Sequence, residues 1–518
     1  MSRNGITDLL FSLRRKGITV WTDNGQLRYR ATKEPLSTEE LEALRTGRAE
    51  IVALLQQTSS LSADQEPKLA PRNYADPVPL SFSQQWWWNG FELGGNPSMR
   101  EIHSAVRLTD NLSIGCLRRS VAELVCRHEA LRTRIIATSD GALVQRIEKP
   151  GELPLEMIDL TRLSRSAQQA EIKLRAQQLV NEPISVARGP LFLARLLKLG
   201  DLEHLLIVAL DHIISDIASL GILWRDLFTL YAQFSRGLPC SLAKLPIQFA
   251  DYAVWQQNTR QWWLNKHGPY WKRQLEGVEP VRLFRDERPV STTPFRRERL
   301  PVQFSETLSS TLRELGRRAR TTTAMSVLTA YAASIFRLSH RTDLVVPLIT
   351  AGRLHPETQN TVGFFGTPAF LRLQIHDRDT FLDLLTHITN EYGSMYPHQD
   401  SCRIAMQLSD PDVMWNPHFN WIPAEFNTPF SEDTRNCDTE LAVRIEPYRL
   451  DIDSRALKWG DGIGLMISDT PDGIAGMLGY RADMFAPDSM ERFARTIHSC
   501  AEKLAFEPYA RVKADSLE

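Results

Sequence analysis

The feature that most constrains this chain is an uninterrupted apolar run at residues 205–210, which stops abruptly at Asp211 and His212. A short continuous apolar run bounded by polar residues predicts a buried β-strand. Apolar side chains then return at the spacing of one helix face, from a helix start near Ser215, at Ile217, Leu220, Trp224, Leu227 and Tyr231. His212 is therefore predicted to lie in a strand-to-helix turn, where rigid elements can hold an imidazole at the edge of a cavity.

The chain after residue 77 continues this alternation of short β-rich runs and helical stripes almost to its end. The pattern predicts a mixed α/β (α+β) fold. At 518 residues, with 42% of them hydrophobic, the chain is long enough to bury more than one core. A tryptophan-rich stretch near residue 270 indicates a boundary, so we expect one lobe over residues 77–260 and a second over residues 261–512.

The first 57 residues are predicted to form a separate small unit with the element order αββαα. An apolar stripe over residues 6–13 predicts the first helix, and Asp-Asn-Gly at 23–25 predicts the turn of a β-hairpin. Ser37 and Glu40 have the spacing of a capping box at the start of the next helical region. Residues 58–76 are polar and rich in Ser and Pro, so they are expected to form a linker.

Charge and cysteine usage narrow the function classes. With 61 Lys and Arg against 62 Asp and Glu, the net charge is −1, so neither nucleic acid nor an anionic membrane is expected as a partner. The six cysteines are scattered and form no C-x-x-C pair, so no metal site is predicted. No apolar run reaches the length of a membrane helix or forms a signal peptide, and we expect a cytoplasmic protein.

Three stretches carry a resemblance to a known family. They are PLSFSQQWWW at 79–88, RHEALRTRI at 127–135 and DHIISDI at 211–217. They are similar, in this order, to the S-x-A-Q-x-R-x-W, R-H-E-x-L-R-T-x-F and H-H-x-x-x-D-G motifs of the condensation domains of nonribosomal peptide synthetases. Later stretches resemble that family's later motifs in the same order: LPIQFADYAVWQQ (245–257), YWKRQL (270–275), AGRLHPE (351–357), TVGFFGTPAFLRL (361–373) and HQD (398–400).

The resemblance implies a pseudo-dimer of two chloramphenicol-acetyltransferase-like lobes with a central tunnel between them. Upstream and downstream carrier proteins would each insert a phosphopantetheine arm, so the chain is expected to bind no cofactor of its own. Residues 1–57 resemble the tubulysin-type N-terminal docking domain, which in that family receives the C-terminal tail of an upstream synthase subunit.

The implied chemistry is acyl transfer, in which an acceptor amine attacks the upstream thioester and an amide forms. The second histidine of the motif, here His212, would position the amine or take its proton, and neutral imidazole suits this role near pH 7. Asp211 and Asp216 belong to the same catalytic motif. Asp216 is placed to pair with an arginine, which the sequence alone does not identify, and the residues expected to give structural support are Arg127, Arg132, Arg134 and Arg353.

The chain departs from the family pattern at four positions. Asp211 replaces the first histidine, Ile217 the glycine, Trp86 the arginine of the first motif, and Thr367 the asparagine of a G-F-F-V-N element. A carboxylate beside His212 is expected to raise the pKa of the imidazole and make it a poorer base. Residues expected to line the tunnel or contact the substrates are Ser215, Ile217, Ser219, Trp86 and Thr367.

Two other interpretations stay open. Asp211, Asp216 and Ser219 fit the D-x-x-x-x-D-x-x-S signature of heterocyclisation domains, which form an amide and then cyclise a Cys, Ser or Thr side chain. The flanking motifs favour ordinary condensation. The third interpretation is a non-catalytic condensation domain that docks carrier proteins or recruits a tailoring enzyme, with its tunnel blocked by Trp86 or Ile217.

The remaining motifs receive structural interpretations. In the N-terminal unit, Arg28 and Arg30 are expected on the hairpin face opposite its core, so an acidic peptide adding beside the hairpin is the docking hypothesis. The Trp86 to Trp88 run is expected to form core and tunnel wall. His128 is interpreted as structural, and no phosphate-binding glycine loop is present, so adenylation is assigned to another protein.

Overall fold

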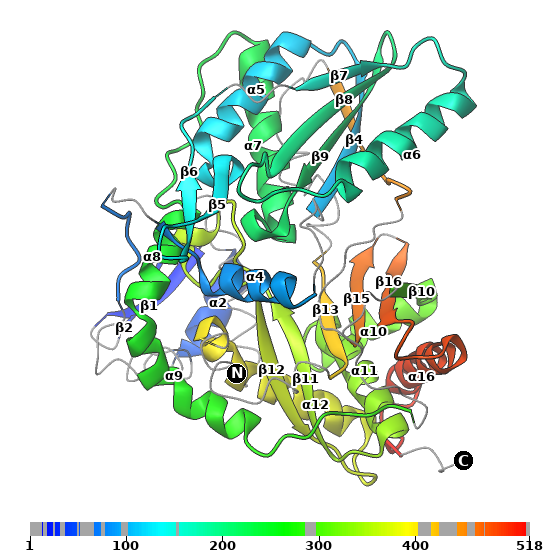
Figure 1. Cartoon of the computed structure of the whole chain (residues 1–518). Coiled ribbons are helices and arrows are strands. Elements are labelled where there is room, and N and C mark those ends of the chain that lie inside the picture. The colour runs from blue at the N-terminus through cyan, green and yellow to red at the C-terminus, as the bar shows by residue number, and fades with distance from the viewer. Residues whose placement is uncertain are drawn as a thin grey trace.

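A computed structural model of the chain describes residue 13, residues 18–23, 26–31, 37–48, 51, 67–73, 78–94, 102–151, 155–284, 297–401, 416–423, 443–452, 462–470 and 472–513. The chain forms two lobes, each built on a β-sheet that carries helices (Figure 1). The predicted mixed α/β, two-lobed fold is confirmed.

The first lobe is built on a five-stranded sheet with the order β14-β4-β9-β8-β7. Strand β9 is apolar from Leu205 to Leu210 because its alternate side chains enter two different cores. Leu206, Val208 and Leu210 pack with one cluster, and Leu205, Ile207 and Ala209 pack with another. Helices α5 and α7 supply the first cluster, and α6 supplies the second, so both faces of β9 are covered. The bounds are β4 Ile102–Asp110, α5 Ile114–Arg127, β7 Glu156–Asp159, α6 Arg165–Asn181, β8 Phe192–Gly200, β9 Glu203–Leu210 and α7 Ile217–Ser235.

A three-stranded sheet of order β3-β6-β5 and several helices extend the first lobe toward the second. Their bounds are β3 Val78–Pro79, α4 Phe82–Gly94, the 3-10 helix η1 Glu129–Arg132, β5 Thr133–Ala137, β6 Leu143–Ile147, η2 His212–Ile214, α8 Phe249–Asn258 and α9 Arg260–Leu275. Helix α9 serves both lobes, because Trp263 lies in the first lobe's core and Trp271 in the second lobe's core.

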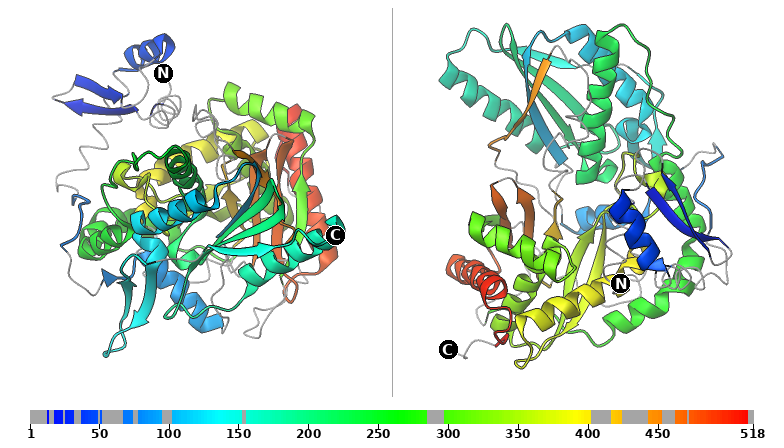
Figure 2. Two further views of the ribbon diagram at one scale, coloured as in Figure 1. Left: turned by 90° about the horizontal axis from the view of Figure 1, so that it is seen from above. Right: turned by 180° about the vertical axis from the view of Figure 1, so that it is seen from behind.

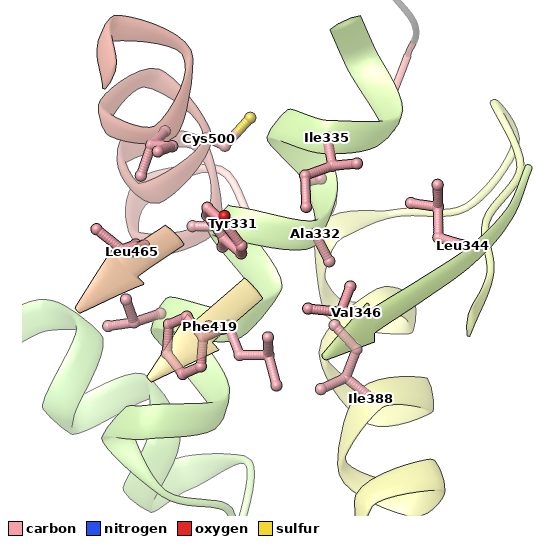
Figure 3. Close-up of a cluster of buried hydrophobic side chains, with 14 of the residues drawn as sticks. Tyr331, Ala332, Ile335, Leu344, Val346, Ile388, Phe419, Leu465 and Cys500 are labelled. Atoms are coloured by element: carbon pink, nitrogen blue, oxygen red, sulfur yellow. The ribbon is translucent and has the colours of Figure 1, made fainter. Parts of the chain in front are cut away.

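The second lobe is built on a six-stranded sheet of order β10-β16-β15-β13-β11-β12. Helix α11 lies against this sheet, and its Tyr331, Ala332 and Ile335 meet Leu344, Val346, Phe419 and Leu465 from the strands and Cys500 from α16 (Figure 3). The bounds are β10 Arg297–Gln303, α10 Glu306–Arg318, α11 Thr323–Ser339, β11 Asp343–Thr350, η3 Pro356–Thr358, β12 Thr367–Gln374, α12 Phe381–Met395, η4 Tyr396–Ser401, β13 His418–Trp421, β15 Ile463–Thr470, β16 Gly473–Arg481 and α16 Pro487–Phe506.

One strand from the second half of the chain belongs to the first lobe. Strand β14 (Val443–Tyr448) pairs antiparallel with β4 over six residues, from Val443 opposite Asp110 to Tyr448 opposite Ala105. The proposed division at residues 260 and 261 does not anticipate this strand, because no local pattern marks which sheet a single strand joins.

The N-terminal unit contains the predicted hairpin, β1 (Ile18–Asp23) and β2 (Gln26–Ala31), and helix α2 (Thr38–Thr46). Figure 2 shows these elements in blue. Val20 lies opposite Tyr29, and Ser37 and Glu40 form the predicted capping box. The helix predicted at residues 6–13 lies outside the described residues, apart from Leu13, which is fully buried.

Candidate active site

The predicted strand-to-helix turn is present, and Asp211 caps it. Strand β9 ends at Leu210, the 3-10 turn η2 begins at His212, and α7 begins at Ile217. The Asp211 carboxylate is fully buried and accepts the backbone N–H of Ile213 at 2.8 Å. The residue that replaces the motif's first histidine therefore fixes the fold of the turn, as aspartate does at many helix starts.

His212 is held in one orientation by the same turn. Its side chain is 8% exposed, and Nδ1 lies 2.8 Å from the carbonyl oxygen of Ser215. A carbonyl oxygen only accepts, so Nδ1 must donate. In the neutral ring the lone pair is then on Nε2, the nitrogen that can take a proton. The Ser215 hydroxyl donates in turn to the carbonyl of Asp211 at 2.9 Å and closes the turn.

Two aromatic rings enclose the imidazole of His212. The ring centroid of Trp87 on α4 lies 4.7 Å away, and that of Phe364 lies 4.4 Å away. Trp87 and Phe364 meet edge to face at 5.8 Å. Trp87 belongs to the tryptophan run that is expected to form core and tunnel wall, whereas the sequence assigns Phe364 no role. Both stand inside motifs that were noted, the tryptophan run and GFFG, but their contact with His212 depends on the meeting of distant segments.

Asp216 joins the two lobes. It caps the N-terminus of α7, accepting the N–H of Ser219 at 2.8 Å. From the second lobe, Arg353 Nη2 approaches Asp216 Oδ1 at 3.0 Å, and the N–H of Phe365 donates to Oδ2 at 3.1 Å. Both side chains of the Asp216–Arg353 pair are buried, at 7% and 6% exposure. The pairing of Asp216 with an arginine is thus present, and the arginine is Arg353.

Ser219 secures the same segment of the second lobe. It is fully buried, and its hydroxyl oxygen lies 3.2 Å from the nitrogen of the Gly363 N–H, which it accepts. Gly363 needs to be glycine, since a Cβ there would lie 2.2 Å from the ring of Phe249 on α8. The chain from Gly363 to Phe365 is therefore pressed between α7 and α8, which fixes Phe364 against His212.

Helix α4 braces the turn from its other side. The Gln84 side-chain amide donates to the carbonyl of Ile213 at 2.9 Å, and the Ser83 hydroxyl donates to the carbonyl of Gly366 at 3.1 Å. Ser83, at the alanine position of the first motif, and Gln84, its glutamine, thus connect both segments that meet at His212. The motif contains these residues, but its sequence gives no sign of which backbone groups they bind.

The remaining predicted tunnel residues lie on three different elements. Trp86 is half-buried on α4, with its ring centroid 6.3 Å from that of Trp87. Ile217 is the first residue of α7 and is partly exposed. Thr367 begins β12, is buried, and its carbonyl accepts the hydroxyl of Thr350 at 3.1 Å.

The arginines of the second motif, which the resemblance implies would brace the loop that carries His212, bond to other elements. Arg127 donates to Asp226 at 2.9 Å, in the middle of α7. Arg132 donates to the carbonyl of Glu148, and the Arg134 guanidinium lies 3.6 Å from the Glu148 carboxylate. They brace α7 and the small sheet, whereas Asp216 is paired with Arg353.

Asp226 is the centre of a second buried charge cluster on α7. It is fully buried and accepts from Arg127, from Arg225 and from His128 Nε2 at 3.0 Å. Burial alone would raise the pKa of Asp226, but the hydrogen bond from His128 and the charge of Arg225 outweigh it and lower the pKa to about 2. His128 ends α5 as a buried residue, as the structural interpretation predicts.

His398 lies in a buried cluster away from His212. Its Nδ1 is 2.8 Å from Nδ1 of His267, and its ring stacks on Tyr270 at 3.9 Å. Cys402, four positions after His398, lies outside the described residues. Within the part of the chain that the structure describes, no group of His, Cys, Asp and Glu is arranged to hold a metal ion. Nor is any helix of that part long and apolar enough to span a bilayer.

Comparison with models of protein families identifies the family of this chain. Residues 74–419 match the family model described as the condensation domain. The chain belongs to the condensation domain family. Residues 6–57 match the TubC N-terminal docking domain, so this condensation domain is preceded by a docking domain.

Curated relatives of this condensation domain are large synthetases. It is 29% identical over 467 residues to one of the subunits of the linear gramicidin synthase of Brevibacillus parabrevis, covering 88% of this chain and 9% of that protein. It is 28% identical over 439 residues to the phosphinothricin tripeptide synthetase PhsC of Streptomyces viridochromogenes, covering 83% of this chain and 39% of that protein. The chain spans less than a tenth of the length of the first curated relatives it matches.

Solved structures share the fold of this condensation domain. The X-domain from teicoplanin biosynthesis aligns with a TM-score of 0.72 at 21% identity, over 87% of this chain and 100% of that one. The first condensation domain of the calcium-dependent antibiotic synthetase aligns with a TM-score of 0.64 at 18% identity, over 86% and 100%. The EpoB cyclization-docking bidomain from Sorangium cellulosum aligns with a TM-score of 0.65 at 18% identity, over 98% and 99%.

Proposed function

We propose that this chain forms an amide bond between an upstream carrier-bound acyl or peptidyl thioester and the amine of a downstream carrier-bound aminoacyl group. The two phosphopantetheine arms are substrates delivered by the carrier proteins. The docking domain would bring the upstream subunit to the condensation domain by receiving its C-terminal tail.

In the proposed reaction the amine nitrogen attacks the thioester carbonyl, the new C–N bond forms, and the C–S bond breaks. The amine loses one proton, and the departing thiolate gains one. His212 Nε2 would accept a hydrogen bond from the attacking amine and hold or take its proton. One group can serve both steps, because the imidazole returns the proton to the sulfur.

The observation that carries the proposal is the hydrogen bond from His212 Nδ1 to the Ser215 carbonyl at 2.8 Å. This bond selects the tautomer with its lone pair on Nε2 and fixes the direction in which that lone pair points. Trp87 and Phe364 hold the ring from its sides and shield it from bulk water.

Heterocyclisation is the second candidate, favoured by the fit of Asp211, Asp216 and Ser219 to its motif. The EpoB cyclization-docking bidomain also has the same two kinds of domain. Against it, each of the three side chains already has a structural bond. Asp211 caps η2, Asp216 pairs with Arg353, and Ser219 holds Gly363. These bonds give all three residues a structural role, which supports condensation as the first candidate.

A recruiting role is the third candidate, because one similar structure is a complex of the teicoplanin X-domain with OxyB. The orientation of His212 weighs against this role, since a platform for a partner has no need of a fixed imidazole tautomer.

The three candidates separate in one experiment: intact-mass spectrometry of the acceptor carrier after incubation of the full chain with loaded donor and acceptor carriers. The condensed mass supports amide formation. A product lighter by one water supports heterocyclisation, and no transfer from several competent donors supports recruitment.

The test variant is His212→Ala. Its matched control is His376→Ala, which replaces a half-exposed histidine in the turn after β12. Loss of the acid–base group should lower the rate at least about a hundredfold, whereas His376→Ala should leave it unchanged. Wild-type turnover in His212→Ala would remove His212 from the chemistry.

A further inference from the structure

Residues 67–73, which composition assigned to the linker, are seated on the first lobe. We name this segment the strap. Leu69 of the strap is 9% exposed and belongs to the first lobe's apolar core. The indole N–H of Trp255 on α8 donates to the carbonyl of Pro67 at 2.8 Å. The strap therefore has both an apolar anchor and a directed hydrogen bond on the lobe.

Arg72 is the strap's strongest attachment. Its Nη1 lies 2.6 Å from Asp251 Oδ1, and its Nη2 lies 3.0 Å from Glu129 Oε2. Its backbone N–H also donates to Asp251 Oδ1 at 3.2 Å. The side chains of all three residues are between 5% and 10% exposed. This arginine makes charge-assisted hydrogen bonds to two carboxylates, its own backbone N–H is engaged, and solvent screens these bonds less than it screens a surface ion pair.

The two carboxylates are held ready for this arginine. Glu129 belongs to the RHEALR motif and follows α5 directly, and its N–H donates to Gln248 at 3.1 Å. Asp251 lies in the first turn of α8, where its second oxygen accepts the N–H of Gln248 at 2.7 Å. These two acidic residues of family-like motifs thus bind the strap and the start of α8 rather than the turn that carries His212.

Arg72, Glu129 and Asp251 form what we call the clamp, and its guanidinium stays charged over the physiological range. Burial alone would lower the pKa of the Arg72 guanidinium, but Glu129 and Asp251 raise it above its ordinary value. The guanidinium of Arg72 therefore keeps its charge while it lies between the two carboxylates.

We propose that the strap docks on the first lobe of its own chain, with Arg72 locked between Glu129 and Asp251. This attachment fixes the point at which the N-terminal docking domain is tethered to the condensation domain. The partner this surface binds is the chain's own linker.

The consequence is a limit on the docking domain's reach. The docking-domain match ends at residue 57 and the strap begins at residue 67. Ten residue steps span at most about 36 Å, whatever their conformation. With the strap released, the first fixed point becomes β3 at residue 78, and the same limit rises to about 75 Å. The clamp therefore halves the largest distance at which an upstream subunit can be held.

This inference uses the docking domain but not the chemistry at His212. An inactive His212 variant would leave the strap attached, and a released strap would leave His212 in place, so failure of one proposal is distinguishable from failure of the other.

Hydrogen exchange of the full chain, read by mass spectrometry over residues 67–73, tests the attachment. In the wild type the strap should exchange slowly. In Arg72→Met it should exchange at least about tenfold faster, because the lost charged hydrogen bonds also hold the segment's backbone. Unchanged protection of β9 in the same sample shows that the fold is retained. Exchange of the wild-type strap at the rate of an unstructured peptide would overturn the proposal without any variant.

Tryptic cleavage gives a second test that keeps the arginine. The Arg72–Asn73 bond should resist trypsin in the wild type and be cut in Glu129→Gln. The matched control is Glu148→Gln, which removes a carboxylate that pairs with Arg134 at 3.6 Å and is 33% exposed. Equal resistance of Glu129→Gln and Glu148→Gln would refute the clamp.

The limit on reach is tested by energy transfer between dyes attached through encoded amino acids at Arg45 of α2 and Arg118 of α5, both exposed. Arg72→Met should lengthen and broaden the distance distribution. The same distribution in both proteins would show that the strap does not set the tether.

Discussion

Replacing Asp216 with alanine should destabilise the protein by about 3–5 kcal/mol, the usual cost of leaving one member of a buried ion pair without its partner. The charge left behind is Arg353, whose side chain is 6% exposed. The N–H groups of Ser219 and Phe365 would also lose their acceptor, at 2.8 and 3.1 Å in the intact protein. Asp216→Ala should therefore lie in the upper half of that range.

The reverse substitution should be milder. In Arg353→Met, the Asp216 carboxylate keeps its bonds from Ser219 and Phe365, so the expected cost is about 1–3 kcal/mol. The double variant should lower the free energy of unfolding by less than the sum of the two single variants, by about 0.5–3 kcal/mol. In the double variant neither buried charge remains without its partner.

Urea denaturation followed by far-UV circular dichroism ranks the four proteins. The two lobes need not unfold together, so the midpoint of the transition in each variant is compared with the wild type rather than converted to a single global value. Arg353→Met as destabilising as Asp216→Ala, or fully additive costs, would refute the claim that charge burial dominates this contact between lobes.

Two further predictions concern acid and the docking hairpin. Burial lowers the pKa of His267 to about 3 and that of His398 to about 4. Both imidazoles stay neutral in the folded chain, whereas in the unfolded chain they take up a proton below pH 6.5. The free energy of unfolding should therefore be highest above pH 6.5 and fall as the pH drops toward 4, by about 2 kcal/mol for His267 at pH 5. Thermal unfolding between pH 7.5 and 5 measures this, and a slope unchanged in His267→Phe would contradict it. For the hairpin, Arg28→Glu with Arg30→Glu should weaken binding of a synthetic acidic tail peptide at least about tenfold at low salt, by calorimetry; equal affinity would reject the charge model.

The elements that sequence patterns predicted correctly are those whose signals are local. The apolar run that became β9 and the stripe that became α7 each carry their own period. The capping box of Ser37 and Glu40 needs only two residues at the right spacing. In these cases the burial of one segment follows from its own composition.

The contacts that the sequence did not predict join segments far apart in the chain. Arg353 meets Asp216 across 137 positions, and Arg72 meets Asp251 across 179. Polar composition correctly marks the region around Arg72 as lacking a helix or strand period. It cannot show that one arginine in that region is buried, because burial depends on carboxylates that the folded lobe brings together.

The substitution at position 211 is best understood from the turn it occupies. Residue 211 stands before a 3-10 turn, where its side chain accepts the N–H of Ile213. A carboxylate offers an acceptor oxygen in any rotation of its end group, whereas a histidine there would accept only in one tautomer. The adjoining hydroxyl of Ser215 reaches the carbonyl of Asp211, and the carbonyl of Ser215 orients His212. Asp211 therefore stabilises the backbone on which the orientation of His212 depends, and its presence is a reason to expect a working imidazole at position 212.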